Sequence, residues 1–257
     1  MNTILKEGQK DLLKYYVFDN RTNAGIFAAN DIAEAILSCL SEKEEINMIF
    51  AAAPSQNDTL AALLERKDIP WNKINAFHMD EYIGLPEQAP QRFGIFLKNA
   101  IFGKVPFKSV NYINGNAADI TEECARYTRL LTEYPTDIVC LGIGENGHIA
   151  FNDPGVADFN DPALIKTADL DDVCRQQQVN DGCFATIDDV PKQALTLTIP
   201  ALTKAKHMFC TVPAATKRWA VKETLNGAIS EACPATIMRK HEHAVLYCDS
   251  LSGGDIL

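Results

Sequence analysis

The sequence lacks the cysteine and charge patterns that mark several classes of protein. Its eight cysteines form no Cys-x-x-Cys pair, and several lie in apolar runs. We therefore expect free, mostly buried thiols rather than disulfides or a zinc site. The net charge is −10, and no cluster of Lys and Arg makes a basic face. This balance argues against nucleic acid as a partner.

Long apolar runs and breaks in composition are missing too. No stretch approaches the roughly 18 uncharged apolar residues of a membrane span, and the polar N-terminus lacks the apolar core of a signal peptide. We therefore expect a cytoplasmic protein with no membrane partner. No low-complexity run, Gly/Ser linker or internal repeat divides the 257 residues. This predicts a single domain over residues 1–257, and the sequence leaves its assembly, including a homo-oligomer, open.

Short apolar runs alternate with segments of helical periodicity along the chain. The predicted strands are 15–19, 46–53, 74–78, 137–142, 194–199, 207–212 and 244–248. The predicted helices are 23–40, 59–66, 91–101, 121–133 and 216–225. This alternation predicts an α/β fold, with a mostly parallel, Rossmann-like sheet and helices on both faces. Ligands of such sheets bind beyond the carboxyl ends of the strands, so polar residues directly after strands are candidate site residues.

The first polar cluster follows the predicted strand 74–78. It places two adjacent carboxylates, Asp80 and Glu81, directly after a buried strand. Adjacent side chains point in different directions, so one carboxylate can face a cleft while the other anchors the loop. A purely structural role, in which Asp80 caps the next turn, fits this short stretch equally well.

The second cluster, residues 142–154, follows the predicted strand 137–142. Its glycines are Gly142, Gly144 and Gly147, and glycine lets a backbone approach a ligand closely. His148 and Asp153 could exchange protons with a substrate oxygen, and a merely structural histidine is the less favoured reading. The spacing matches no zinc pattern, and the Gly-x-Gly-x-x-Gly pattern lies past mid-chain rather than in a first βα unit. We therefore expect neither a metal nor a cofactor.

The third cluster lies between the predicted strand 207–212 and the predicted helix 216–225. Thr216 can cap that helix, which places Lys217 and Arg218 in its first turn. Cations at this end oppose the helix dipole. A nearby anion, such as a phosphate, explains the pair better than a solvated basic surface does.

Two of these stretches resemble a known family. Residues 77–86, Phe-His-Met-Asp-Glu-Tyr-Ile-Gly-Leu-Pro, are similar to the FxMDEYxGLP string of glucosamine-6-phosphate deaminases, and residues 142–154 are similar to their GxGxxGHIxFNEP string. Shorter matches follow in order over nearly the whole chain. The resemblance implies an enzyme that converts glucosamine 6-phosphate and water to fructose 6-phosphate and ammonia.

The resemblance also implies roles for individual residues. Asp80 would be the base that moves a proton between C2 and C1 of the sugar, and His148 would open the pyranose ring. Asn146 and Asp153 would flank and orient this histidine, and Lys217 would bind the phosphate. Further candidate substrate-binding residues in the same strings are Glu81, Gly144 and Gly147.

The sequence departs from the family at the histidine's neighbours. Asn146 stands where many deaminases have Asp, and Asp153 stands where Glu is usual. An Asn can orient an imidazole, but it cannot stabilise an imidazolium by charge. A side chain one methylene shorter displaces its carboxylate by about 1 Å, which matters for catalysis, so we expect a shifted loop or substrate.

The phosphate ligands depart as well. The family's Gly-rich turn corresponds to residues 52–59, which contain no glycine. The side chains of Ser55, Gln56 and Asn57 are candidates to replace its backbone donors, or else the site is reshaped for another substrate. Cys183 stands where the family has a phosphate-binding Arg before an aromatic residue. The candidates to compensate for that Arg are Arg175 and Arg218.

Other activities of the same fold stay open. A 6-phosphogluconolactonase usually continues its Gly-rich string with Thr-Ala-Ser, whereas residues 149–152 read Ile-Ala-Phe-Asn, which favours a deaminase. A deaminase or isomerase for another amino-sugar phosphate, such as galactosamine 6-phosphate, is a second alternative. A non-catalytic sugar-phosphate sensor is the alternative from another class. Such sensors are attached to a DNA-binding domain, for which we expect the stretch before Tyr15 to be too short.

Overall fold

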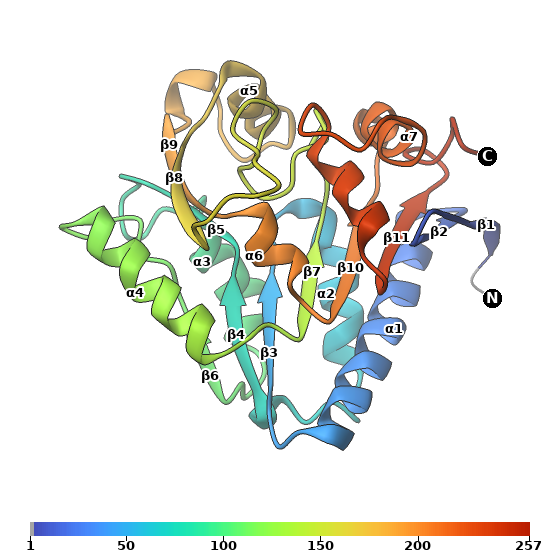
Figure 1. Ribbon diagram of the computed structural model, residues 1–257, viewed down its shortest axis with the longest axis horizontal. Helices are drawn as coiled ribbons and strands as arrows, with labels where there is room; N and C mark the ends of the chain where they lie inside the picture. The colour runs from blue at the N-terminus through green and yellow to red at the C-terminus, as the bar shows by residue number, and fades with distance from the viewer. Residues whose placement is uncertain (1–2) are drawn as a thin grey trace.

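The fold is built on one large, mostly parallel sheet (Figure 1). The computed structural model describes residues 3–257. In order across this sheet the strands are β1 (Ile4–Lys10), β2 (Leu13–Phe18), β11 (Ala244–Asp249), β10 (His207–Val212), β7 (Ile138–Leu141), β3 (Ile46–Phe50), β4 (Ile74–His78) and β6 (Ser109–Asn111). β1 is antiparallel to β2, and the other neighbouring strands pair in parallel.

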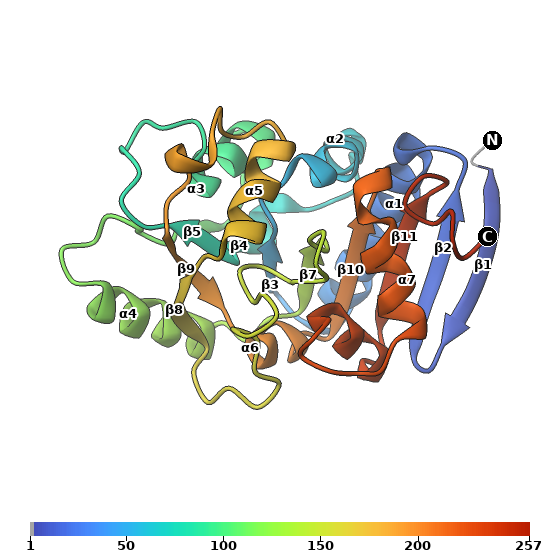
Figure 2. The ribbon, with the colours of Figure 1, turned by 90° about the horizontal axis from the view of Figure 1, so that it is seen from above.

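Helices cover both faces of the main sheet, as the view from above shows (Figure 2). One face carries α1 (Arg21–Glu42), α2 (Asn57–Glu65) and α3 (Phe93–Leu97), which runs on into a π-helical turn, Lys98–Phe102. The other face carries α4 (Ile120–Glu133), α6 (Ile199–Thr203) and α7 (Arg218–Asn226). Alternate strand residues serve the two faces, because Met48 and Phe50 belong to one hydrophobic cluster and Ile49 to the other. The predicted α/β architecture is confirmed.

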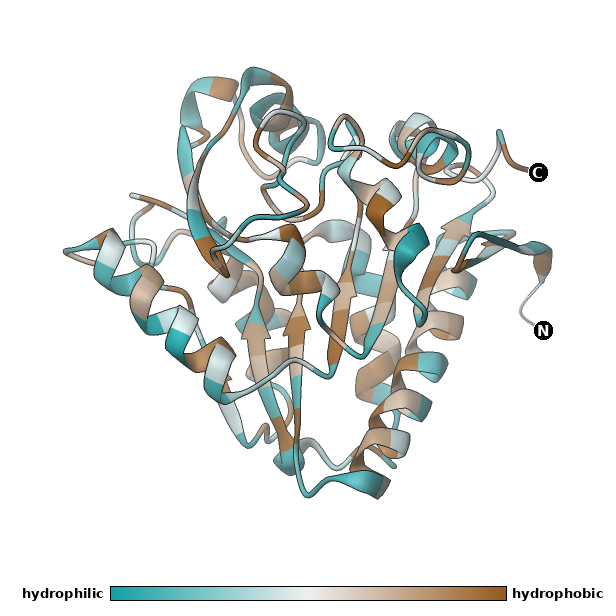
Figure 3. Cartoon of the chain, in the orientation of Figure 1, coloured by the Kyte–Doolittle hydropathy of each residue, from teal (hydrophilic) through white to brown (hydrophobic). Residues whose placement is uncertain are grey.

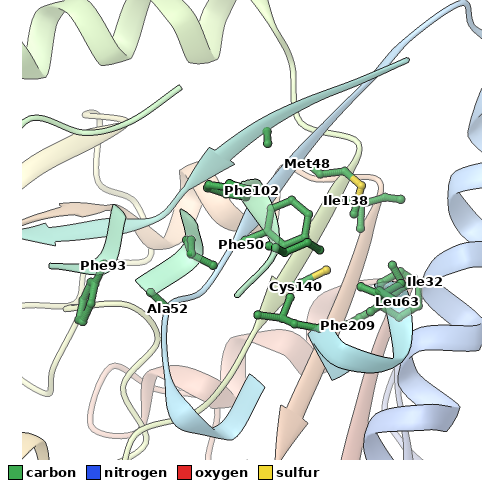
Figure 4. Packing of buried hydrophobic residues seen from close by; sticks show 14 of the residues in the cluster. Ile32, Met48, Phe50, Ala52, Leu63, Phe93, Phe102, Ile138, Cys140 and Phe209 are labelled. Atoms are coloured by element: carbon green, nitrogen blue, oxygen red, sulfur yellow. The ribbon is translucent and has the colours of Figure 1, made fainter. Parts of the chain in front are cut away.

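The apolar strands in the middle of the sheet make the core (Figure 3). On the face under α1 and α2, Phe50, Cys140 and Phe209 belong to one buried cluster with Ile32 and Leu63 of these helices (Figure 4). α1 is long and apolar enough, by length and composition alone, to cross a membrane. Half of its most apolar stretch is buried inside the protein, as is usual for the core helix of an α/β fold.

A second, antiparallel sheet lies above the carboxyl ends of the main strands (Figure 1). Its strands are, in order, β5 (Asp80–Tyr82), β9 (Gln193–Leu197) and β8 (Ile165–Asp169). α5 (Asp172–Asn180) follows β8 at the same end of the molecule. Only Met79 separates β4 from β5. The chain therefore passes from one sheet into the other at Asp80. The main sheet holds the chain up to His78, and the second sheet holds Asp80 itself.

Most predicted elements are confirmed, and the differences have physical causes. The predicted strand 194–199 is β9, but it pairs antiparallel in the second sheet. The predicted helix 216–225 begins at Arg218 after a 3₁₀ turn, and Thr216 makes no capping hydrogen bond. The sequence does not predict the following short or polar elements: β1, β5, β6, β8, α5 and α6. They carry no clear local periodicity, and the strands among them exist through their pairing, β1 with the adjacent β2 and the others with segments farther along the chain.

Candidate active site

A pocket opens where the strands of the main sheet end. About 880 Å³ of free space lies in it and over its mouth, open solvent included. Its wall comes from the segments that follow β3, β4, β7 and β10, and from α5 and the loop after it. Asp80, His148 and Lys217 line this pocket together. The structure thus brings one residue from each polar cluster of the sequence to one place.

Asp80 is a buried carboxylate at the pocket wall. Its Oδ1 atom has no hydrogen-bond partner among residues 3–257. Burial, together with the Glu81 carboxylate, raises the pKa of Asp80 well above its ordinary value. A carboxylate with a raised pKa is a stronger base, which is what proton abstraction from carbon requires.

Neighbouring residues hold the backbone at Asp80. His78 Nε2 accepts a hydrogen bond from the Ile113 amide at 2.9 Å, so His78 Nδ1 donates to the Asp80 carbonyl at 2.8 Å. Burial lowers the pKa of His78 to about 4, which keeps this ring neutral and the donor in place. Sequence reasoning missed His78, although it stands in the same string as Asp80.

Glu81 is not among the residues that line the pocket, which corrects its expected place as a substrate-binding residue. It is 1% exposed, and its oxygens accept hydrogen bonds from the amides of Tyr82, Phe93 and Gly94, each at 3.0 Å. These bonds tie β5 to the start of α3. Of the two adjacent carboxylates, one faces the pocket and the other anchors the chain.

His148 belongs to a buried polar group with Asn146 and Asp153. Its Nδ1 atom lies 2.8 Å from Asp153 Oδ1, and the Asn146 side chain donates to the same oxygen at 2.8 Å. Asn146 also accepts from the His148 amide at 3.1 Å. Burial alone would raise the pKa of Asp153, but the His148 charge and the hydrogen bonds around the carboxylate outweigh burial and lower it. His148 Nδ1 thus lies against the carboxylate, although the contact lacks the geometry of a hydrogen bond.

The glycines of this loop have different purposes. A Cβ atom on Gly144 would lie 2.1 Å from His148 Cε1, so only glycine lets the imidazole lie across this backbone. Gly147 has a φ of +85°, and a Cβ atom there would meet Cys233 Sγ at 2.4 Å. Gly144 lines the pocket, whereas Gly147 packs away from it. The expected place of Gly147 at the substrate is therefore corrected: this glycine serves the turn.

Cys174 of α5 completes the surroundings of Asp153. The side chains of His148, Asp153 and Cys174 each place one polar atom within 4.8 Å of the others, and such a set could hold a metal. A thiol must be deprotonated to bind a metal, and burial with the adjacent Asp153 carboxylate raises the pKa of Cys174. A neutral thiol beside this carboxylate fits these groups better than a metal ligand does.

Two cations reach the pocket. Lys217 is 6% exposed, burial lowers its pKa, and the carboxylates of Asp181 and Glu145 oppose this effect. The ammonium group of Lys217 takes part in none of the ion pairs within residues 3–257. Arg21 also lines the pocket and is held by Asp58 at 2.6 Å and by the Pro54 carbonyl at 2.9 Å. Sequence reasoning missed Arg21, which directly follows a strand like the other candidates.

The family follows from comparison with known proteins. A family model described as glucosamine-6-phosphate isomerases/6-phosphogluconolactonase matches residues 20–247. The chain belongs to this family. It is 35% identical over 223 residues to glucosamine-6-phosphate deaminases of Bacillus thuringiensis (strain Al Hakam) and Bacillus cereus (strain AH820), which is 85% of this chain and 83% of each relative. The resemblance of the two strings is thereby confirmed.

Solved structures of the family share the fold. A monomeric glucosamine-6-phosphate deaminase superposes with a TM-score of 0.83 at 28% identity, over 94% of this chain and 98% of that one. A 6-phosphogluconolactonase of Thermotoga maritima superposes with a TM-score of 0.75 at 21% identity, over 92% of this chain and 99% of that one. The second likeness concerns the fold alone.

The turn that departs from the family needs no glycine here. No residue between 51 and 57 has a positive φ. Ser55 lines the pocket, but Gln56 is buried and donates to the Thr211 carbonyl at 3.1 Å, which ties the turn to β10. Asn57 is exposed at the start of α2. The expected places of Gln56 and Asn57 at the phosphate are therefore corrected, because the first anchors the turn and the second faces solvent.

Neither arginine proposed to compensate for Cys183 lines the pocket. Arg175 donates to the Ile187 carbonyl at 2.6 Å and to the Val190 carbonyl at 3.3 Å. These hydrogen bonds hold α5 against the loop that follows it. Arg218 donates to the Leu251 carbonyl at 3.1 Å near the C-terminus. Both expected places are corrected, and Arg21 is the arginine at the pocket.

Besides Cys183, whose position the resemblance placed at the phosphate, three residues of α5 and the loop after it line the pocket without a signal in the sequence. Gln177, Gln178, Asp181 and Cys183 line the pocket from this side. Gln177 also accepts from the Glu145 amide at 2.7 Å, so α5 is fastened to the Gly-rich loop of the family. A long polar stretch with weak periodicity gives no sequence signal for such a contact.

Proposed function

We propose that this chain converts glucosamine 6-phosphate, or a close relative, and water to fructose 6-phosphate and ammonia. The observation that carries the proposal is the pocket that Asp80, His148 and Lys217 share. It offers a strong carboxylate base, an imidazole backed by a carboxylate, and a cation for a phosphate. The activity named for the curated relatives supports the same reaction.

Substrate binding starts from the phosphate. Lys217 and Arg21 supply positive charge, and Ser55 supplies a hydroxyl donor from the turn after β3. Fixing the phosphate there presents the sugar ring to the rest of the pocket, and such positioning contributes much of the rate in enzymes of this kind.

Ring opening is the task of His148. Its protonated imidazole gives a proton to the ring oxygen as the C1–O bond breaks. The neutral imidazole then takes the proton of the C1 hydroxyl, which leaves an aldehyde. Asp153 balances the charge that His148 carries while it is protonated. Asn146 holds that carboxylate in place.

Deamination then follows from one proton transfer. Asp80 takes the proton from C2, which is acidic beside the new carbonyl, and returns it to C1. The electron pair of the C2–H bond forms a C1=C2 bond while the carbonyl oxygen takes a proton back from His148, which gives an enolamine. When C1 takes the proton from Asp80, the nitrogen lone pair forms the C2=N bond of an iminium ion. Water adds to that carbon and ammonia leaves, which gives the ketose phosphate.

An assay of the purified protein tests the proposal. Glucosamine 6-phosphate, galactosamine 6-phosphate and 6-phosphogluconolactone are offered in parallel, and ammonia release and lactone hydrolysis are followed. We expect ammonia from an amino-sugar phosphate and no lactone hydrolysis above the uncatalysed rate. Lactone hydrolysis without ammonia would instead assign the lactonase activity, and binding without turnover would assign a sensor.

We also propose a cytoplasmic location. All eight cysteines are free and six are buried, which suits a reducing compartment. The partner that we propose for the site is the sugar phosphate.

A further inference from the structure

The phosphate end of the pocket has little positive charge to spare. Among residues 3–257, the lysine and arginine side chains that line the pocket are Lys217 and Arg21, and Asp58 already pairs with Arg21 at 2.6 Å. Cys183 stands where the resemblance places an arginine. Burial raises the pKa of its thiol, so this side chain stays neutral and adds no charge.

A carboxylate lines the same pocket. Asp181, directly after α5, is half-buried and forms none of the ion pairs within residues 3–257. In this part of the chain its side chain receives one hydrogen bond, from Gln177 Nε2 at 3.4 Å, which is long for such a bond. Burial lowers the pKa of Lys217, and Asp181 is the strongest of the charges that raise it. Asp181 therefore lies near Lys217 with oxygens free to accept.

Glu145 adds to the negative charge at this end. Its carboxylate also raises the pKa of Lys217 against burial, and its buried Oε1 atom has no hydrogen-bond partner among residues 3–257. Together with Asp58 and Asp181, it sets three carboxylates against the charges of Lys217 and Arg21. The second negative charge of a phosphate group is therefore opposed in this pocket.

We propose that the pocket binds the phosphate group in its singly charged form, whose P–OH group donates a hydrogen bond to Asp181. A phosphate ester loses its second proton at about pH 6, so both forms are present near neutrality. The singly charged form brings a donor to Asp181 and keeps acceptor oxygens for Lys217 and Arg21, and O–H donors bond strongly to carboxylates. The inference rests on the proposed function for the phosphate itself and deepens it by naming the form that binds.

The proton of the bound phosphate is measured directly by ³¹P NMR. The probe is glucitol 6-phosphate, which has neither a carbonyl nor an amine and so cannot react. The titratable groups that share the pocket wall with Asp181 are Arg21, Asp80, His148, Cys183 and Lys217. The phosphorus signal reports the phosphate's own step rather than theirs. For the wild-type complex we expect this step at least about one pH unit above that of the free probe, which corresponds to tenfold tighter binding of the singly charged form.

Asp181→Asn removes the charge that opposes the doubly charged form. We expect the step of the bound probe to return to about pH 6 or below, and the probe to bind about tenfold more tightly than to wild type at pH 8. Asp188→Asn, an exposed residue outside the pocket, is the matched control and should behave as wild type. A wild-type step at or below that of the free probe, or the same raised step in Asp181→Asn, would overturn the proposal.

The readout separates this inference from the proposed function. A protein that releases ammonia but binds the doubly charged phosphate refutes the inference alone. A protein that binds the singly charged form through Asp181 but releases no ammonia refutes the proposed reaction alone. A wild-type protein that binds no glucitol 6-phosphate also overturns the inference, and ammonia release then decides the proposed function by itself.

Discussion

At the scale of single residues, two buried carboxylates meet opposite environments. Burial and Glu81 raise the pKa of Asp80, whereas His148 and neighbouring donors lower that of Asp153 against the effect of burial. One group is thereby made a strong base, and the other is kept as a fixed anion. This division matches the proton transfer and the ring opening that we propose for the pocket.

Asp80→Asn should abolish turnover and stabilise the protein. The base is lost, so we expect kcat to fall at least about 100-fold while substrate binding stays measurable by calorimetry. Because the pKa of Asp80 is raised on folding, the wild-type protein loses stability as pH rises from the ordinary carboxyl pKa through the raised one. The variant should therefore be the more stable protein at neutral pH and lose this advantage in acid. Asp169→Asn, an exposed control, should do neither, and normal turnover by Asp80→Asn would contradict the assignment.

Lys217→Met should weaken binding of the phosphate. The variant keeps the length of the side chain but removes a buried charge, so we expect KM to rise about 10-fold or more with a smaller effect on kcat. Arg21→Met should act in the same direction. Arg218→Met is the neighbouring control outside the pocket, and an equal rise in KM there would show that general charge matters rather than these two contacts.

The sequence could identify Asp80, His148 and Lys217 because each follows a strand whose carboxyl end must face the ligand side. The sequence could not tell which of the two adjacent carboxylates faces the pocket. That depends on the amides of Phe93 and Gly94, which are distant in sequence and donate to Glu81 in the folded chain. It also could not place Arg175, whose partners are carbonyl groups of a loop with no pattern of its own.

At the scale of elements, the pocket depends on how closely α1 and α2 approach. A Cβ atom on Gly25 would lie 2.6 Å from Asp58 Cβ and 2.8 Å from the Asp58 backbone carbon. α2 follows the turn that carries Ser55, and Arg21 of α1 pairs with Asp58 of α2. The spacing of the two helices therefore sets both the turn and the arginine of the phosphate end.

Gly25→Ala should separate these helices. We expect a loss of stability of about 1–3 kcal/mol from overpacking and a raised KM, both measured on one preparation by denaturant unfolding and by ammonia release. Ser38→Ala lies on the exposed side of α1 and should leave both quantities unchanged. A wild-type KM in a destabilised Gly25→Ala protein would contradict the link between helix spacing and binding.

Elements with local signals were predictable and those without were not. α1 carries a helical apolar periodicity in the sequence, and β3 is a compact apolar run. β8 is a half-exposed polar strand that exists because it pairs with β9. α5 is polar, and its place over the pocket depends on contacts such as that of Gln177 with the Gly-rich loop. The part of the site that α5 supplies was for this reason beyond sequence reasoning.

At the scale of the whole molecule, an acidic protein gathers two cations at one end of its sheet. The net charge of −10 makes non-specific attraction of a sugar phosphate unfavourable, so binding depends on the local charges of Lys217 and Arg21. The main sheet, the second sheet and α5 each supply part of the pocket wall. The account therefore requires the reacting groups of all these parts to act on one molecule of substrate.

The fate of the hydrogen at C2 tests this requirement most directly. Glucosamine 6-phosphate labelled with deuterium at C2 is turned over, and ammonia and the label in the product are measured by NMR. We predict that wild type releases ammonia and forms fructose 6-phosphate with part of the label moved to C1, and that Asp80→Asn does neither. Failure of the wild-type protein to release ammonia, or release by Asp80→Asn at the wild-type rate, would contradict the account.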